Sequence, residues 1–176
     1  VPAANPLATL TRRQAFPTDS GWTERCRHNM NRLWPGRADG TLTEMIAAAI
    51  FEEVVRHCDA VLDLHCTEIT YPVHTLALRS HEEGAKLAQV FGAPVAYLRG
   101  DEGRRGLLYE VAPRELGIPA MIAELPPLRL ITEPSASIGE RGILNVMRFL
   151  GMLEGDLDLP PRRAVVTPEC RSAEVR

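Results

Sequence analysis

Two polar side chains close short apolar runs of this sequence, and their types suit metal-assisted hydrolysis. His65 ends the run Val-Leu-Asp-Leu-His, and Glu124 ends the run Ala-Met-Ile-Ala-Glu. A neutral imidazole is the commonest metal ligand, and a carboxylate beside a metal-bound water can take its proton as the water attacks a carbonyl. Asp63 precedes His65 by two residues and so shares its strand face, where it would orient the imidazole or the water. The alternative for the histidine alone is a structural one, because a strand-end histidine is more often only hydrogen-bonded.

A second group of candidate residues lies in the first forty residues, which show little periodicity. Arg32 offers a planar fork of donors that matches a carboxylate, and the adjacent Asn31 adds a donor and an acceptor. Arg13, or its neighbour Arg12, would supply a cation to the oxyanion that develops on a scissile carbonyl. The alternative for Arg32 is a surface arginine beside the Trp-Pro-Gly turn that follows it.

Alternating helices and strands must position these residues. Apolar residues at helical spacing behind a Thr-x-x-Glu capping box predict a helix from Thr41 to about His57. Apolar runs and glycine stops predict strands at 60–65, 75–78, 94–98 and 119–124, and further helices at 80–90, 106–116 and 139–153. This alternation predicts an α/β sheet covered on both faces. Ligands gather at the carboxyl ends of the strands in such sheets, where the sequence places His65 and Glu124.

Composition limits the classes of function. The chain has 176 residues, of which 45% are hydrophobic, which fits one globular domain with a core. Its 20 basic and 23 acidic residues give a net charge of -3, which offers no strong field for nucleic acid or an anionic membrane. No apolar run reaches the roughly 20 residues that span a bilayer, and no signal pattern opens the chain, so we expect a cytoplasmic setting. The 4 cysteines form no C-x-x-C pair and are expected to be reduced thiols.

Taken in order, the motifs resemble the succinylglutamate desuccinylase/aspartoacylase family, which is related to the zinc carboxypeptidases. The resemblance covers about residues 2–153. The matching segments are Asn5-Pro6-Leu7-Ala8, Arg13 with Pro17 and Asp19, Asn31-Arg32 with Pro35-Gly36, Asp63-Leu64-His65, and Gly117-Ile118-Pro119 leading to Glu124. The resemblance implies a mixed sheet with helices on both faces, as in zinc carboxypeptidases, often followed by a smaller β-rich domain.

The resemblance also implies an activity: zinc-dependent hydrolysis of an amide bond in an N-acyl amino acid or related small molecule. His65 would be the third zinc ligand, and Glu124 the general base that activates the metal-bound water. Asn31 and Arg32 would bind the substrate carboxylate, and Arg13 would polarise the amide carbonyl. The implied cofactor is Zn2+ and the implied partner is the small-molecule substrate, with no nucleic acid and no membrane. Assembly into a homo-oligomer is left open.

We interpret residues 1–153 as a catalytic α/β domain that is incomplete at its N-terminus. Residues 154–176 would be a linker and the start of a truncated C-terminal β domain. The family carries its first two zinc ligands in a Gly-x-His-x-x-Glu motif that lies before the Asn-Pro-Leu-Ala segment. In this sequence only Val1 to Ala4 come before that segment, so the motif is missing. Because a catalytic zinc needs three protein ligands and an open position, the chain by itself is expected to be inactive.

Two alternatives to the deacylase remain at this stage. One is a metal-free remnant that binds carboxylates through Asn31 and Arg32, and the other is a carboxypeptidase that uses the same pair on a peptide C-terminus. Departures from the family pattern bear on substrate identity more than on reaction type. They are Asn29-Met30 in place of Asp-Leu, an extra loop at Ser20–His28, Cys66 in place of a small hydroxyl residue, and Leu125-Pro126-Pro127 in place of a glycine-rich turn.

Overall fold

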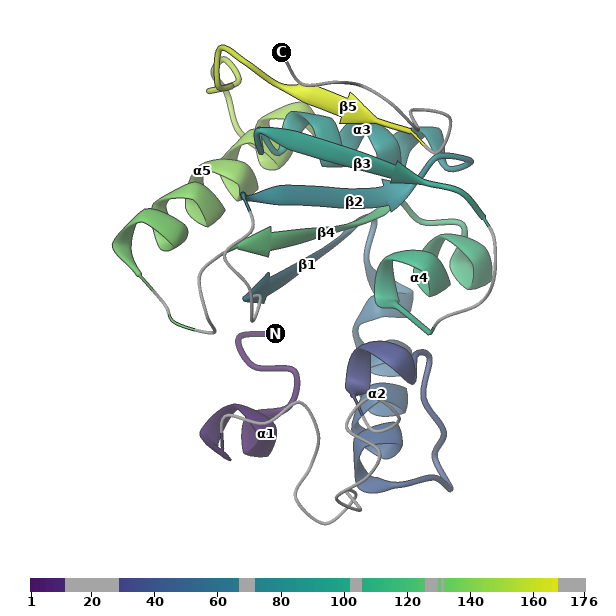
Figure 1. Ribbon diagram of the computed structural model, residues 1–176. Helices are drawn as coiled ribbons and strands as arrows, with labels where there is room; N and C mark the ends of the chain where they lie inside the picture. Colours follow the sequence, from purple (N-terminus) through teal and green to yellow (C-terminus); the bar gives the residue numbers. More distant parts are fainter. Residues whose placement is uncertain (12–28, 67–71, 102–105, 126–129, 131, 168–176) are drawn as a thin grey trace. The chain divides into compact units, whose positions relative to one another are not determined.

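The computed structural model describes residues 1–11, 29–66, 72–101, 106–125, 130 and 132–167 (Figure 1). These residues belong to two compact units. The first unit comprises residues 1–59 and 103–118, and the second comprises residues 60–102 and 119–176. Within the described ranges, no helix combines the length and the apolar character that crossing a membrane requires.

The first unit is helical in its described residues. Its elements are α1 (Pro6–Thr11), the 3-10 helix η1 (Met30–Arg32), α2 (Leu42–Glu53), the 3-10 helix η2 (Val55–His57) and α4 (Leu108–Leu116). Asn5 starts α1, because its Oδ1 accepts a hydrogen bond from the Ala8 N–H at 3.0 Å. Thr41 and Glu44 form the expected capping box at the start of α2, where the Glu44 carboxylate accepts from the Thr41 N–H at 2.7 Å.

The helix expected to run to His57 continues as an α-helix only to Glu53. The chain then leaves helical geometry at Val54, with φ -124° and ψ -63°, before the 3-10 turn of η2. Val54 and Val55 are both β-branched and lose side-chain freedom in a helix, which weakens the helix at this point. The apolar periodicity alone does not reveal this break.

The second unit contains a five-stranded sheet with the strand order β1-β4-β2-β3-β5 (Figure 1). The strands are β1 (Val61–Cys66), β2 (His74–Leu78), β3 (Val95–Arg99), β4 (Ala120–Leu125) and β5 (Ala164–Val166). The pairs β1–β4, β2–β3 and β3–β5 are parallel, whereas β2 and β4 are antiparallel. The expected α/β class with a mixed sheet is therefore confirmed.

Helices α3 (Glu82–Val90) and α5 (Glu133–Phe149) pack on one face of this sheet. The core between them is built from small and large apolar side chains, including Ala77, Leu87, Phe91, Met121 and Val146. Thr75 also faces this side, because its hydroxyl donates to the Ala88 carbonyl at 2.7 Å. Since side chains alternate along a strand, the residues on either side of Thr75 point to the opposite face.

Glycine is required where α5 crosses α3. A Cβ added at Gly142 would lie 2.3 Å from the Phe91 ring, closer than van der Waals contact allows. The missing side chain lets the Phe91 ring, 1% exposed, lie directly against the α5 backbone. This close approach fixes how α5 packs over the core.

Helix α5 starts earlier than expected, at Glu133 instead of about Gly139. Thr132 and Ser135 form a capping box in which the Ser135 hydroxyl accepts from the Thr132 N–H at 3.1 Å. The sequence pattern missed this start because a serine takes the position that a glutamate or glutamine usually occupies. The helix accordingly places Ile138 against the core.

The segment after α5 is fastened to that helix before it joins the sheet. Asn145 is fully buried, and its amide group donates to the Asp158 carbonyl and accepts from the Asp158 N–H, both at 2.8 Å. Strand β5, which lies inside the 154–176 segment, then pairs with the edge of β3.

Candidate active site

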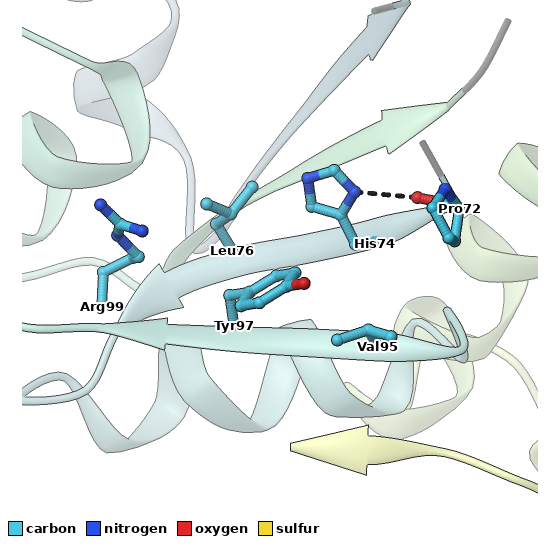
Figure 2. Close-up of a pocket in the computed structure, with 6 residues that line it drawn as sticks. All are labelled: Pro72, His74, Leu76, Val95, Tyr97 and Arg99. Carbon is cyan, nitrogen blue, oxygen red and sulfur yellow. Dashed lines mark hydrogen bonds between the residues drawn. The ribbon is translucent and has the colours of Figure 1, made fainter. Parts of the chain in front are cut away.

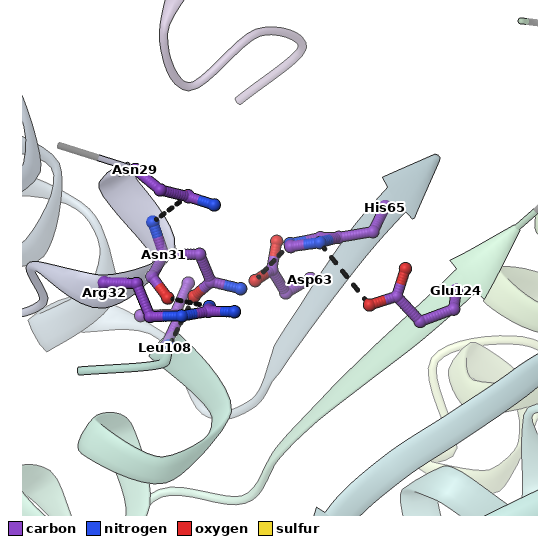
Figure 3. A network of polar contacts seen from close by, with 7 residues as sticks. All are labelled: Asn29, Asn31, Arg32, Asp63, His65, Leu108 and Glu124. Atoms are coloured by element: carbon purple, nitrogen blue, oxygen red, sulfur yellow. Dashed lines mark hydrogen bonds and ion pairs between the residues drawn. The ribbon is translucent and has the colours of Figure 1, made fainter. Parts of the chain in front are cut away.

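Strand register brings His65 and Glu124 together. Strands β1 and β4 run parallel, and His65 lies in register with Glu124. Both residues are next to last in their strands, so their side chains lie at the carboxyl edge of this strand pair. His65 Nδ1 is 3.7 Å from Glu124 Oε1, as Figure 3 shows. Their side chains are 29% and 20% exposed, so that both remain accessible from outside.

Asp63 holds the histidine ring from the other side. His65 Nε2 lies 3.0 Å from Asp63 Oδ2 (Figure 3). In the neutral tautomer that donates its Nε2–H to the Asp63 carboxylate, the lone pair of Nδ1 lies on the side of Glu124. Metal-binding histidines commonly donate their second ring N–H to a carboxylate in this way. His65 is therefore suited to serve as one ligand of a zinc ion through Nδ1.

The described residues do not supply the other ligands of a complete metal site. In the part of the chain that the structure describes, no group of three or more His, Cys, Asp or Glu side chains is arranged to hold a metal ion. The fit to zinc consists of one imidazole, its carboxylate partner Asp63 and the adjacent Glu124.

Cys66 adjoins this pair and is not poised to act as a thiolate. Burial raises the pKa of the Cys66 thiol above its ordinary value, and the negative charge of Glu124 raises it further. The thiol also donates to the Leu130 carbonyl at 3.7 Å. A protonated thiol is a poor nucleophile and a poor metal ligand, so the chemistry of this edge belongs to the imidazole and the carboxylates.

Asn31 and Arg32 lie in the first unit, where their loop is built onto the start of α4. Asn31 Oδ1 accepts a hydrogen bond from the Leu108 N–H at 2.9 Å, and Asn31 is only 8% exposed (Figure 3). Leu107, which precedes the helix, supplies no side-chain cap, so Asn31 satisfies this helix N–H instead. The Arg32 guanidinium donates through Nη1 to the Asn31 backbone carbonyl.

Two further contacts join this loop to the chain before α4. The Trp34 N–H donates to the Gly106 carbonyl at 3.2 Å. Gly106 has φ +64°, and a Cβ added there would lie 2.3 Å from the Arg32 carbonyl oxygen. Sequence reasoning did not single out Gly106. A glycine just before a helix is a weak local signal, and its partner is far away in the sequence.

The remaining predicted residues, Arg12 and Arg13, lie outside the described residues. Their role at the carbonyl stays a prediction.

A hollow of about 250 Å³ lies on the sheet face opposite α3 (Figure 2). It is lined by Pro72, His74, Leu76, Val95, Tyr97 and Arg99. The antiparallel pairing of β2 with β4 puts His74 in register with Glu124, so the hollow begins in the same row of residues as Glu124. His74 Nδ1 donates to the Pro72 carbonyl at 2.9 Å, and its ring meets the Tyr97 ring edge-on at 5.4 Å. Sequence analysis assigned no function to His74, Tyr97 or Arg99.

A mixed α/β sheet with polar side chains at the ends of its strands is a common enzyme architecture. The chain belongs to the succinylglutamate desuccinylase/aspartoacylase family, whose catalytic-domain model matches residues 1–150. The family expected from the ordered motifs is therefore confirmed.

Curated and solved relatives agree with this assignment. The N-alpha-acetyl-L-2,4-diaminobutyric acid deacetylase of Halomonas elongata is 33% identical over 170 residues, which cover 91% of this chain and 46% of the relative. The product-bound ectoine utilization protein EutE (DoeB) from Ruegeria pomeroyi has a TM-score of 0.79 at 25% identity, over 94% of this chain and 51% of that one. A succinylglutamate desuccinylase from a Silicibacter species has a TM-score of 0.80 at 26% identity, over 97% and 51%. The chain thus spans about half the length of these relatives, two of which are named as a deacetylase and a desuccinylase.

Proposed function

We propose that this protein is a zinc-dependent deacylase that hydrolyses the amide bond of an N-acyl amino acid or a related small molecule. The observation that carries the proposal is the His65 and Glu124 pair at the sheet edge, with the imidazole held by Asp63. Family membership supports the same reaction class, because a curated relative is named as a deacetylase of an acetylated amino acid.

His65 would hold the zinc ion through Nδ1, while Asp63 keeps the proton on Nε2. When bound, zinc supplies a Lewis acid that makes water more acidic and polarises the scissile carbonyl. Asp63 would contribute by keeping the ring in one tautomer and one orientation, so that the imidazole does not have to reorganise when the metal binds.

Glu124 would move the proton. Its carboxylate accepts a proton from the attacking water as the new carbon–oxygen bond forms. It then delivers that proton to the amide nitrogen as the carbon–nitrogen bond breaks, which releases a carboxylic acid and an amine. The partly exposed position of Glu124 lets water and substrate reach it.

Arg32 would recognise the carboxylate of the amino acid half of the substrate through its planar fork of donors. Asn31, which is built into the start of α4, would support the loop that presents Arg32. Arg13 would stabilise the oxyanion that develops on the amide carbonyl.

The test compares Glu124→Gln with Glu140→Gln, a change at an exposed position of α5. The full-length protein, loaded with zinc, would be assayed with N-acetyl and N-succinyl amino acids, and with peptides that have a free C-terminus, because the chain by itself is expected to be inactive. We expect Glu124→Gln to lower kcat by about 10² to 10⁴-fold with unchanged zinc content, because it removes the general base. Glu140→Gln should match the unchanged protein.

Two results would overturn the proposal. One is full activity in the Glu124→Gln variant. The other is that the full-length, zinc-loaded protein cleaves none of the N-acyl amino acids. Cleavage of peptides alone would identify a carboxypeptidase instead.

A further inference from the structure

The loop that carries Arg32 is anchored at both of its ends. This Arg32 loop comprises residues 29–41 and leads directly into α2. One end is joined to the start of α4, where Asn31 accepts from the Leu108 N–H and the Trp34 N–H donates to the Gly106 carbonyl. The other end runs into α2, so the place of Arg32 depends on the contacts at α2 as well as on those at α4.

The contacts at α2 converge on Glu44. Its carboxylate oxygen Oε2 accepts hydrogen bonds from the Thr41 N–H at 2.7 Å and from the Thr41 hydroxyl at 3.0 Å. Its backbone carbonyl accepts a hydrogen bond from the Arg37 N–H at 3.2 Å. A capping box by itself joins only the N-cap residue and the third residue of the helix. Because Glu44 also holds Arg37, it fastens the loop at a second point, four residues before the helix cap.

Two glycines allow the loop backbone to close on Glu44. A Cβ added at Gly36 would lie 2.4 Å from the Glu44 carbonyl oxygen and 2.3 Å from the Ala48 backbone nitrogen, and Gly36 has φ +92°. A Cβ added at Gly40 would lie 2.5 Å from Glu44 Oε2. Glycine alone combines the positive φ at Gly36 with this close approach. The Arg32 loop therefore lies directly against the first two turns of α2.

A short run of backbone hydrogen bonds connects this anchorage to Arg32. The Gly36 N–H donates to the Leu33 carbonyl at 2.7 Å, and the Leu33 N–H donates to the Met30 carbonyl at 2.9 Å. Arg32 lies inside this run (Figure 3). Its side chain is exposed, whereas Met30 is 7% exposed. The backbone of Arg32 is thus fixed while its guanidinium stays open to a ligand.

We propose that Glu44 is a positioning residue for Arg32, which holds the Arg32 loop in its binding shape before the substrate arrives. The inference rests on the proposed role of Arg32 in binding the substrate carboxylate. When a loop is already ordered, no part of the substrate binding energy is used to order it. Without the Glu44 carboxylate, the substrate has to order the loop as it binds, which raises KM and leaves kcat unchanged.

The test uses the full-length, zinc-loaded protein and two matched substrates. One is the N-acyl amino acid that the protein cleaves fastest, and the other is the same molecule with a carboxamide in place of the amino acid carboxylate. We expect Glu44→Ala to raise KM for the carboxylate substrate by about fivefold, the size of a lost helix cap, with unchanged kcat. KM for the carboxamide should change little, because that substrate does not use the charge of Arg32.

Two further variants show whether the carboxylate of Glu44 is responsible. Glu44→Gln keeps an acceptor for the Thr41 N–H and should restore the KM of the unchanged protein. Glu53→Ala, at an exposed position near the end of α2, should also match the unchanged protein. Hydrogen exchange at the Thr41 amide provides a readout that does not depend on turnover, and we expect faster exchange in Glu44→Ala only.

A double-mutant cycle shows whether Glu44 acts through Arg32. Arg32→Gln by itself should raise KM for the carboxylate substrate, because it removes the cation that pairs with the carboxylate. If Glu44 acts by holding Arg32, Glu44→Ala should raise KM little further when it is combined with Arg32→Gln. A role in stability alone would instead lower the amount of folded protein, and with it the apparent kcat on both substrates.

The outcomes separate this inference from the proposed function. The positioning role is wrong if Arg32→Gln raises KM but Glu44→Ala leaves it unchanged, lowers kcat on both substrates, or adds its full effect to that of Arg32→Gln. The assignment of Arg32 as the carboxylate-binding residue then stands. If Arg32→Gln leaves KM unchanged, that assignment fails, and the positioning role of Glu44 fails with it.

Discussion

The side-chain carbonyl of Asn31 accepts a hydrogen bond from the backbone N–H of Leu108, 77 residues further along the chain, at 2.9 Å. The contact is buried, and it uses an asparagine as the cap of a helix that has no cap of its own. The loop that carries Arg32 is thereby tied to the first turn of α4.

Two replacements of Asn31 test whether its side chain stabilises the loop by capping α4. Asn31→Ala leaves the Leu108 N–H without its acceptor, which should cost about 1–3 kcal/mol of unfolding free energy. Asn31→Asp keeps an acceptor oxygen at the same place and should retain most of that stability. Urea denaturation measures both values, and hydrogen exchange at the Leu108 amide reports the contact itself. Equal stability of the alanine variant and the unchanged protein would contradict the capping role.

Gly106→Ala should disturb Arg32 from the other side of the same loop. The new Cβ would lie 2.3 Å from the Arg32 carbonyl oxygen, at a position with φ +64°. Gly117→Ala is a matched control at the opposite end of α4, because Gly117 has φ +71° but nothing within 4 Å of an added Cβ. Both variants carry the strain of a left-handed alanine, about 1–2 kcal/mol. Only Gly106→Ala should also raise KM for the N-acyl amino acid, and a similar rise in Gly117→Ala would contradict this.

Asp63→Asn should weaken zinc binding while leaving the fold intact. The substitution removes the carboxylate that accepts from His65 Nε2 at 3.0 Å, so that the ring tautomer and orientation are no longer fixed. Loss of such a partner typically lowers metal affinity by about 10–100-fold. Competition with a chelator measures the affinity, and Asp156→Asn, an exposed aspartate, serves as the control. Unchanged zinc affinity in Asp63→Asn would show that His65 is not a ligand held in this manner.

Gly142→Ala should destabilise the second unit through overpacking. The added methyl group would meet the buried Phe91 ring at 2.3 Å, and forced overpacking of a core costs about 1–3 kcal/mol. Combining it with Phe91→Leu should recover part of this cost, because the smaller side chain leaves room for the methyl group. A double-mutant cycle in urea denaturation measures the coupling. Simple additivity of the two changes would mean that the two residues do not press on each other.

The sequence predicted elements well where the signal is local. The Thr41 capping box, the four strands expected at 60–65, 75–78, 94–98 and 119–124, and the stop of α4 at Gly117 all depend on neighbouring residues, and all are found within a few positions. The start of α5 was missed because its capping box uses Ser135. Strand β5 was missed because three residues are too few to show alternation.

The candidate site was predictable only in part, for a physical reason. Apolar runs revealed that His65 and Glu124 end strands, but no local pattern states which strands are neighbours or in which register they pair. Asn31 shows the same limit, because no local pattern indicates that its side chain accepts a hydrogen bond from the distant Leu108 N–H. Its contact with substrate stays a prediction. The parts of the candidate site that could not be predicted depend on contacts between residues that lie far apart in the sequence.

The antiparallel pairing of β2 with β4 decides which strand ends can meet at the candidate site. Strands β1 and β4 reach that edge of the sheet with their last residues, whereas β2 and β3 reach it with their first residues. A polar side chain that ends β3, such as Arg99, therefore lies toward the opposite edge of the sheet from His65 and Glu124, and only a residue near the start of β2 or β3 could join them.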